Sequence, residues 1–174
     1  MNDSKLQTIT AGEVAASAPL GAAMLALNNA HAQELSWLEP TRLEQLVTQA
    51  FLARRIGNLD AFLLAFDQDA RYDSPNFLWF RDRYPRFVYV DRIAVARSAR
   101  GRGLARLLYS DLFEEARRRA HDHIVCEVNL APPNPPSDAF HAALGFVEVG
   151  RANIHNGSKT VRYLQRTLEI TGTR

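Results

Sequence analysis

The chain has 174 residues, of which 47% are hydrophobic and 23% are charged. This composition is that of a globular protein, and it excludes intrinsic disorder, collagen and coiled coil as the main architecture. Cys126 is the only cysteine, which excludes a disulfide scaffold and agrees with a reducing compartment. The formal net charge of +2 is too small to indicate a nucleic-acid partner, and we expect none.

No uninterrupted apolar run reaches the about 18 residues that indicate a membrane span, so we expect no membrane partner. Residues 14–32 imitate a secretion signal, but Glu13 and Pro19 interrupt the apolar stretch. We therefore expect a cytoplasmic protein. The first residues are polar, and we expect a loose N-terminal segment over residues 1–18 followed by one domain over residues 19–174.

The first half of the chain combines short apolar runs with turn residues. Residues 22–27 form an apolar run that is compatible with a strand. The spacing predicts a helix over residues 41–50, because apolar residues recur there on one face. Two strands are predicted over residues 51–56 and 59–66, joined by a Gly-Asn turn.

The second half begins with residues 68–86, which interleave aromatic residues with arginines and show no clear period, as is typical of a functional connection. The predicted strand over residues 87–95 leads through a glycine-rich turn into the strongest helix, residues 103–120. The remaining pattern predicts a strand over residues 124–128, a proline-rich bend over residues 131–136, a helix over residues 138–144 with Ser137 as N-cap, and strands over residues 146–149 and 161–170. Strands and helices thus intercalate around one core, which predicts a mixed α/β fold.

The passage from this strand into the long helix has the form of an anion site. Gly101 and Gly103 lack Cβ atoms, so a ligand can approach their backbone N–H groups closely. Free N–H groups at a helix start attract phosphate, and the neighbouring Arg100, Arg102 and Arg106 add positive charge. The alternative is a plain helix start, in which glycine serves the turn and arginine serves solubility.

Two known phosphate-binding motifs are absent, and their absence narrows the choice of ligand. The dinucleotide fingerprint Gly-x-Gly-x-x-Gly fails because Arg106 stands at its third glycine, and the ATP-binding sequence Gly-x-x-x-x-Gly-Lys-Ser/Thr does not occur. NAD and ATP are therefore not expected. A second basic run, residues 117–119, follows Glu114 and Glu115 at helix-pair spacing and is better explained as a solvated helix end.

Two motifs carry a resemblance to a known family. Residues 100–105, Arg-Gly-Arg-Gly-Leu-Ala, resemble the Arg/Gln-x-x-Gly-x-Gly/Ala motif of the GNAT superfamily of N-acetyltransferases. Residues 93–95 look like the splayed strand before that motif, and Asn134 with residues 140–146 is similar to the second motif, an Asn followed by aromatic-Tyr-x-x-Leu-Gly-Phe. The resemblance covers most of the chain, and residues 27–36 also look like an uncharacterised subgroup of predicted acetyltransferases.

The resemblance implies an α/β fold in which a mostly antiparallel mixed sheet has a splayed pair of parallel strands at its centre. It also implies acetyl-CoA as cofactor, with the pyrophosphate on the turn amides and the pantetheine arm between strands that end near Val95 and Val128. The extended cofactor then resembles a strand added to unpaired backbone groups. The expected cofactor-binding residues are Ile93, Val95, Arg100, Gly101, Arg102, Gly103, Leu104, Ala105, Arg106 and Asn134.

Acetyl transfer to an amine needs a base for the ammonium and an acid for the departing thiolate. Glu127 looks like the strand glutamate that some members of the family use as base, and its alternative role is an ion pair with an arginine. Asp91 and Tyr89 share one face of the preceding strand, and either is an alternative base. Asp91 would otherwise pair with Arg92 or Arg54.

His141 stands where the family usually has a tyrosine acid. A histidine can protonate a thiolate, because its usual pKa of about 6.5 lies below the about 8.5 of a thiol. The alternative is a histidine on the helix surface. Cys126 is expected to be a small core hydrophobe rather than an acyl carrier.

The acceptor is expected to meet residues from the first half of the chain. The resemblance places Asn28, His31 and Trp37 where the first strand passes into acceptor-lining helices. The expected substrate-binding residues are Asn28, His31, Trp37, Phe77, Tyr89 and Asp91. The alternative for the aromatic residues 74–86 is that they cover the core or a homodimer interface.

Motifs and resemblance together predict an acetyl-CoA-dependent N-acetyltransferase that acts by direct transfer within a ternary complex, with Glu127 as base or water positioner and His141 as acid. The acceptor is an amine of a small molecule or of a peptide or protein, and no metal is expected. Two alternatives stay open. One is a non-catalytic acyl-CoA-binding sensor or scaffold, and the other is a phosphate- or nucleic-acid-binding protein that uses the arginine turn.

Overall fold

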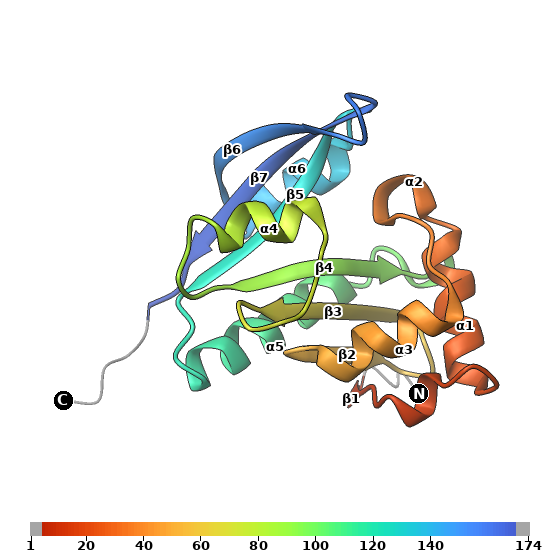
Figure 1. Cartoon of the computed structure of the whole chain (residues 1–174). Coiled ribbons are helices and arrows are strands. Elements are labelled where there is room, and N and C mark those ends of the chain that lie inside the picture. Colours follow the sequence, from red (N-terminus) through yellow and green to blue (C-terminus); the bar gives the residue numbers. More distant parts are fainter. Residues whose placement is uncertain (1–4, 170–174) are drawn as a thin grey trace.

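Residues 5–169 of the chain are described by a computed structural model, and within them seven strands form one sheet (Figure 1). The strands are β1 (Leu6–Thr8), β2 (Leu52–Ile56), β3 (Ala61–Asp67), β4 (Val88–Val95), β5 (His123–Ala131), β6 (Val147–Ile154) and β7 (Lys159–Thr167). The helices are α1 (Pro19–Asn29), α2 (Ala32–Leu35), α3 (Pro40–Gln49), α4 (Pro75–Arg81), α5 (Leu104–Arg118) and α6 (Pro135–Ala143), with short 3-10 turns at Gly12–Val14 and Arg97–Ala99. The strand order is β1-β2-β3-β4-β5-β7-β6. β4 and β5 run parallel and the other neighbours run antiparallel, which confirms the predicted mixed sheet.

Side-chain alternation along the central strands divides the core into two layers. On β3, the odd-numbered residues from Ala61 to Ala65 pack with α5, and the even-numbered residues from Phe62 to Phe66 pack with α1, α3 and α4. Figure 1 shows α5 behind the sheet and α3 and α4 in front of it. β3 is therefore apolar on both faces, because helices cover it on both sides.

The parallel pairing between β4 and β5 is short. Parallel pairing begins at Val88 of β4 and ends at Tyr89. Directly after it, β4 carries a β-bulge in which Asp91 is the extra residue, because Val90 and Arg92 pair with consecutive residues of β3. A bulge bends its strand. β4 therefore turns away from β5, and the two central strands splay.

α5 follows β4 after the glycine-rich turn. Its apolar stripe consists of Leu104, Leu108, Leu112 and Ala116, which recur at i, i+4 spacing and are buried against the sheet. The helix begins after Gly103, whose φ of +73° is a left-handed conformation that glycine adopts at little cost. The predicted helix is thus confirmed, and its start is fixed by a glycine.

The apolar run over residues 22–27 is not a strand but the middle of α1, so that prediction is wrong. Periodicity alone does not separate a short buried strand from a buried helix segment. Here Pro19 stands at the first helical turn, and the alanine-rich sequence favours a helix. Met24 is the fully buried side chain that holds α1 against the core.

The expectation of a loose segment over residues 1–18 is wrong for its described part. β1 pairs with β2 as an edge strand, and Val14 is buried beside α1. The segment is polar overall, so the few apolar residues that attach it to the core did not stand out in the sequence. Residues 1–4 lie outside the described residues, as do residues 170–174, which include the end of the predicted last strand and of the predicted domain.

The predictions for the remaining helices need one correction. The predicted helix over residues 41–50 is confirmed as α3. α6 begins at Pro135, earlier than expected, because Asn134 and not Ser137 is its N-cap. The side-chain oxygen of Asn134 accepts a hydrogen bond of 3.4 Å from the backbone N–H of Ser137.

The long connection between β3 and β4 packs on the sheet through α4. The indole of Trp79 stacks on the ring of Tyr163 from β7, with centroids 4.2 Å apart and planes inclined by 23°. Phe80 meets the same ring edge-on at 5.2 Å. Gly150 of β6 makes room for the indole, because a Cβ atom at this position would lie 2.4 Å from Cζ2 of Trp79. The aromatic residues of α4 thus cover the core.

The contact between Gly150 and Trp79 yields a stability prediction. We expect Gly150→Ala to lower the free energy of unfolding by about 1–3 kcal/mol, because the indole must leave its stack on Tyr163. Urea unfolding followed by tryptophan fluorescence measures this change. Gly12→Ala is the matched control, since its Cβ would meet no atom within 4 Å. Equal stabilities of the two variants would contradict the packing described here.

Candidate active site

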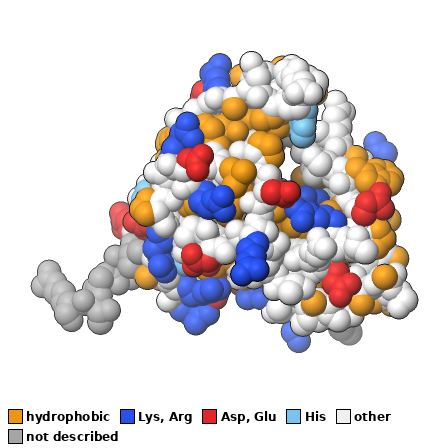
Figure 2. Space-filling model, in the orientation of Figure 1, with side chains coloured by type: hydrophobic (Ala, Val, Ile, Leu, Met, Phe, Trp, Pro, Cys, Tyr) orange, Lys and Arg blue, Asp and Glu red, His pale blue; other side chains and the backbone are white. Residues whose placement is uncertain are grey.

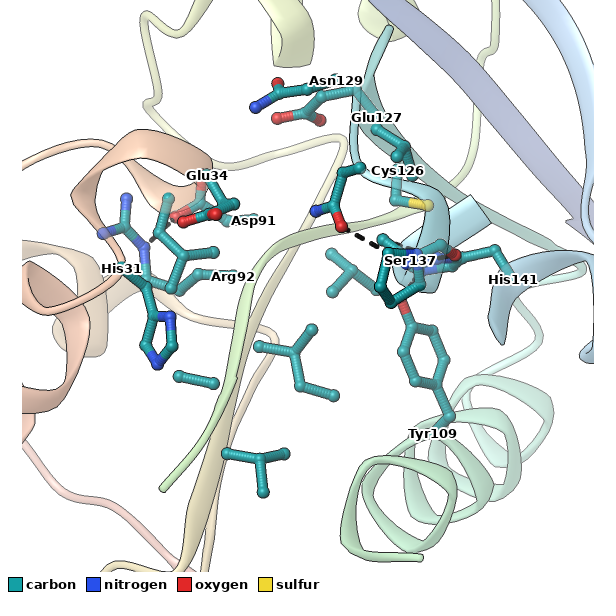
Figure 3. Close-up of a pocket in the computed structure, with 18 of the residues that line it drawn as sticks. His31, Glu34, Asp91, Arg92, Tyr109, Cys126, Glu127, Asn129, Ser137 and His141 are labelled. Atoms are coloured by element: carbon teal, nitrogen blue, oxygen red, sulfur yellow. Dashed lines mark hydrogen bonds and ion pairs between the residues drawn. The ribbon is translucent and has the colours of Figure 1, made fainter. Parts of the chain in front are cut away.

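A cleft of about 500 Å³ opens where β4 and β5 separate. It is lined by both strands and by side chains of α2, α5 and α6. Figure 3 shows His31, Glu34 and Arg92 on one side of the cleft and Tyr109, Cys126 and His141 on the other. In Figure 2 the surface is hollowed between the part built from β6 and β7 and the part built from α1 and α2.

One wall of the cleft is the edge of β4 that the splay leaves without a strand partner. Pairing with β5 ends at Tyr89, and Ile93 and Val95 line the cleft beyond this point. An unpaired strand edge binds an extended ligand through its backbone N–H and C=O groups. Arg100 and Asn134 line the same cleft. These four predicted cofactor-binding residues therefore lie together.

The turn between β4 and α5 continues this wall. Gly101 and Gly103 have φ values of +76° and +73°, and a Cβ atom on either would meet nothing within 4 Å. The turn therefore exposes its backbone amides at the start of α5, where the first N–H groups lack intrahelical acceptors. The side chain of Leu104 is buried in the core, so this residue offers only its backbone. Arg102 forms an ion pair with Asp60 at 2.8 Å.

Glu127 lies on β5 directly opposite Tyr163 of β7. Among the described residues its Oε2 atom has no hydrogen-bond partner, although it is shielded from solvent. Burial raises the pKa of Glu127 to about 7; hydrogen bonding from Tyr89 and Asn76 opposes this rise, and the charge of Asp91 adds to it. Glu127 is thus a carboxyl group that exchanges protons near neutral pH.

A second cavity of about 320 Å³ lies beside the first. It is bordered by the N-terminal end of α4 and by the turn between β6 and β7. Glu34, Asp91, Arg92 and Glu127 line both cavities. Glu127 therefore stands in the wall that the two cavities share, within reach of ligands in either.

α2 lies across the two cavities and is attached to the far side by one backbone atom. The carbonyl oxygen of Gln33 accepts a hydrogen bond of 3.4 Å from Nδ2 of Asn129 on β5. It also accepts one of 3.3 Å from Nζ of Lys159 on β7. The neighbouring Glu34 and Leu35 line both cavities. α2 thus links the first half of the chain to the second across the cleft.

Asp91, the bulge residue, is fully engaged by its neighbours. Its Oδ1 accepts a hydrogen bond of 2.6 Å from Tyr72, and its Oδ2 forms a 2.6 Å ion pair with Arg92. This is the alternative role that the sequence left open. Arg92 in turn donates to Oδ1 of Asn28 at 2.9 Å. Asn28 is fully buried and also binds the carbonyl of Ser36, so it fixes α1 and does not line either cavity.

His141 and Tyr109 form a buried pair between α5 and α6. Oη of Tyr109 lies 2.8 Å from Nε2 of His141, and Nδ1 of His141 lies 2.8 Å from the carbonyl oxygen of Ser137. A carbonyl only accepts, so Nδ1 carries the proton of the neutral ring and Nε2 accepts from the Tyr109 hydroxyl. Burial lowers the pKa of His141 and raises the pKa of Tyr109. Both groups are therefore neutral near pH 7.

The other predicted acceptor residues are spread over different surroundings. His31 lines the first cavity and Tyr89 the second. Trp37 is 65% exposed, donates to Glu39 and lines neither cavity. Phe77 is fully buried in the aromatic core. The predictions of Trp37 and Phe77 as acceptor-binding residues are therefore corrected. An aromatic residue in a connection can point to solvent or into the core, and the sequence pattern is the same in both cases.

Two site residues were missed by the sequence interpretation, Tyr109 and Asn76. Tyr109 lies next to the apolar stripe of α5 and meets His141, 32 residues later, only in the folded chain. Asn76 lies in the long connection among aromatic residues and lines the second cavity. No periodic signal marks either residue, because each acts through a partner that is remote in sequence.

Among residues 5–169, no group of three or more His, Cys, Asp and Glu side chains is arranged to hold a metal ion. No helix within the same residues combines the length and the apolar character that crossing a bilayer requires. Cys126 is buried, and burial holds the pKa of its thiol well above the usual range.

Comparison with known families decides what kind of fold carries this cleft. The model of the acetyltransferase (GNAT) family matches residues 30–146. The chain belongs to the GNAT acetyltransferase family. The match extends over the splayed strands, the glycine turn and α6, and acetyl transfer from acetyl-CoA is the reaction of this family. A search of curated proteins gave no significant match.

Solved structures of GNAT proteins share the fold over nearly their whole length. The ribosomal-protein-S18-alanine N-acetyltransferase from Escherichia coli superimposes with a TM-score of 0.69 at 15% identity, covering 98% of this chain and 97% of that one. The ribosomal-protein-alanine N-acetyltransferase from Brucella melitensis gives 0.66 at 20% identity, with coverage of 94% and 99%. The NatC complex bound to Gag peptide and CoA gives 0.69 at 14% identity, with coverage of 95% and 98%.

The cleft of this GNAT protein fits acetyl-CoA. The open backbone of Gly101 and Gly103 suits a pyrophosphate, and the unpaired edge of β4 suits an extended pantetheine arm. The cofactor supplies an activated thioester when it is bound. This chain offers the turn amides and the cleft for that group.

The glycine turn yields a binding prediction. We expect Gly103→Val to weaken acetyl-CoA binding about tenfold or more, because a branched side chain at a φ of +73° displaces the turn amides. Isothermal titration calorimetry measures the affinity. Gly157→Val is the matched control, since Gly157 has a φ of +83° in the turn between β6 and β7. A Gly103→Val protein with wild-type affinity would exclude this turn from the cofactor site.

Proposed function

We propose that this protein is an N-acetyltransferase that moves the acetyl group from acetyl-CoA directly to an amine within a ternary complex. The observation that carries the proposal is the position of Glu127. Its unpartnered Oε2 stands in the wall between the cleft that fits the donor and the second cavity. An amine that enters the second cavity therefore meets a base beside the thioester.

The donor side of the proposal uses the cleft and the turn. Backbone groups of residues 100–105 bind the pyrophosphate, with Arg106 on the first turn of α5 adding positive charge. Ile93, Val95 and Asn134 line the path of the pantetheine arm. The backbone N–H groups of β4 near Val95 orient the thioester carbonyl.

Glu127 acts as base in this proposal. The ammonium of the acceptor transfers a proton to the Glu127 carboxylate, and the free amine then attacks the carbonyl carbon. A carboxyl group with a pKa of about 7 is suited to this task, because it is both ionised and basic near neutral pH. Asp91 is less suited, since Tyr72 and Arg92 already occupy both of its oxygens.

Tyr109 acts as acid in this proposal, and His141 positions it. Because Nδ1 of His141 donates to Ser137 and Nε2 faces Tyr109, neither ring nitrogen is free to reach the sulfur. Nε2 carries no proton in this tautomer, so His141 holds Oη of Tyr109 as a hydrogen-bond acceptor and supplies no proton itself. The phenolic proton passes from this hydrogen bond to the sulfur as the carbon–sulfur bond breaks, and the Tyr109 phenolate regains a proton from solvent after CoA leaves.

The acceptor of the proposal is an amine of a small molecule or of a peptide. The names of the similar structures favour a peptide, because the Escherichia coli protein acts on an alanine of a ribosomal protein and the NatC complex holds a peptide. Glu34 and Glu127 in the lining of the second cavity suit a cationic group, whereas Asp91 there is neutralised by Arg92. We place the protein in the cytoplasm, where its single thiol stays reduced.

Turnover against a panel of amines tests the function. Acetyl-CoA is offered with small amines and with peptides that differ at the N-terminus, and mass spectrometry detects the acetylated product. We expect kcat/KM to rise with pH and to level off above about pH 7, because Glu127 must lose its proton to act as base. Glu127→Gln removes this limb and lowers kcat about 100-fold or more.

Glu44→Gln, on the exposed surface of α3, is the control for this measurement and should keep the wild-type profile. A Glu127→Gln enzyme with normal turnover at every pH removes Glu127 from the mechanism. Binding of acetyl-CoA without product from any amine favours the alternative of a non-catalytic acyl-CoA-binding sensor or scaffold.

The acid side gives a separate prediction. We expect Tyr109→Phe to lower kcat about 10- to 100-fold with acetyl-CoA affinity unchanged, because the phenolic proton serves only the departure of the thiol. Steady-state kinetics and calorimetry separate the two effects. Tyr84→Phe is the control, because the Tyr84 hydroxyl contacts only Gln165, away from both cavities. Equal kcat values for the two variants would rule out Tyr109 as proton donor.

A further inference from the structure

α4 is the helix that the chain places between β3 and β4, and one of its faces points at the sheet (Figure 1). Asn76, Trp79 and Phe80 share this face, because residues i, i+3 and i+4 of a helix lie one above the other. Trp79 and Phe80 both contact the ring of Tyr163. The aromatic contacts therefore hold Asn76 at a defined place.

Asn76 is 8% exposed, and its Oδ1 accepts a hydrogen bond of 2.9 Å from the hydroxyl of Tyr163. Tyr163 is the residue of β7 directly opposite Glu127, so the two side chains share one face of the sheet. Asn76 and Glu127 both line the second cavity, so with Oδ1 committed to Tyr163 the Nδ2 donor of the amide is left to face Glu127. Hydrogen bonding from Asn76 accordingly lowers the pKa of Glu127. A reversed amide would turn Oδ1 toward the carboxylate, and two acceptors repel each other.

We propose that Asn76, oriented by Tyr163, is a positioning residue that holds the Glu127 carboxylate in the wall of the acceptor cavity, which both residues line. This inference rests on the proposed function in naming Glu127 as base. α4 then has a second role besides covering the core, because it carries the residue that positions the base. The helix carries both its aromatic anchors and the amide that they aim at the base.

The surroundings of Glu127 set the direction of the expected effect. The titratable groups that act on it from the surrounding elements include Tyr72, Tyr89, Asp91, Tyr109, Cys126 and Tyr163. The other charged or titratable residues that line the second cavity with it are Glu34, Arg42, Asp73, Arg92, His155 and Lys159. Burial and Asp91 favour the protonated form of Glu127, and the donors Tyr89 and Asn76 favour the ionised form. Loss of the Asn76 donor therefore raises the pKa of Glu127.

Carbon-13 NMR of protein labelled at the glutamate carboxyl carbons tests the proposal without any turnover. The Glu127 signal is assigned by its loss in Glu127→Gln and is followed through a pH titration. We expect Asn76→Ala to raise the pKa of Glu127 by about one pH unit, which is the effect of one lost hydrogen-bond donor on a buried carboxylate. Tyr163→Phe removes one oxygen atom, keeps the stack on Trp79 and should raise the pKa by a smaller amount.

Matched controls separate positioning from general damage. Asn58→Ala, in the exposed turn between β2 and β3, and Tyr84→Phe should leave the titration of Glu127 unchanged. Tyr163→Phe keeps the test valid if Asn76→Ala does not fold. An unchanged Glu127 titration in Tyr163→Phe and in folded Asn76→Ala would overturn the positioning role.

Kinetics then show whether the positioning serves the proposed reaction. In an active enzyme, the acidic limb of kcat/KM should move to higher pH by the amount that NMR measures for each variant. A shifted titration in a protein that acetylates no amine keeps the positioning inference and overturns the proposed function. A limb that does not follow the titration excludes Glu127 as the base that Asn76 positions.

Discussion

The β-bulge at Asp91 is the constraint on which the rest of the structure depends. One extra residue on β4 ends the parallel pairing at Tyr89 and bends the strand away from β5. The bend leaves backbone N–H and C=O groups of β4 without a strand partner, and such unpaired groups are costly in a buried sheet. Here the separation opens the cleft that fits acetyl-CoA, and the unpaired edge of β4 lines it. A local irregularity of one residue thus creates the binding site.

The two carboxylates near the bulge, Asp91 and Glu127, have opposite surroundings. Asp91 is satisfied by Tyr72 and Arg92, and Arg92 is held by Asn28, so this network is neutral and rigid. Glu127 lies nearby with one oxygen unpartnered. A buried carboxyl without a full set of partners costs stability, and such groups concentrate at functional sites. This contrast between two neighbouring carboxylates is the reason why we propose Glu127, and not Asp91, as the reactive group.

The sequence predicted what depends on local pattern. The glycine turn, α5 and the strands around them follow from spacing and from residues such as Gly103, which need no distant partner. α1 was mistaken for a strand because a short apolar run fits both structures. Tyr109 and Asn76 escaped because their roles arise from His141, Tyr163 and Glu127, which only the fold brings near. Asn28 was predicted to bind the acceptor, but its polar side chain is buried in the core.

The attachment of α2 has a consequence for how such a protein changes over generations. Asn129 and Lys159 both bind the main-chain carbonyl of Gln33, and a carbonyl is present whatever side chain stands at that position. The helix therefore stays in place while Gln33 and its neighbours are substituted. Glu34, which borders both cavities, can vary without removing either hydrogen bond of this bridge. The lining of both cavities can thus change by point mutation while the attachment of the helix stays the same.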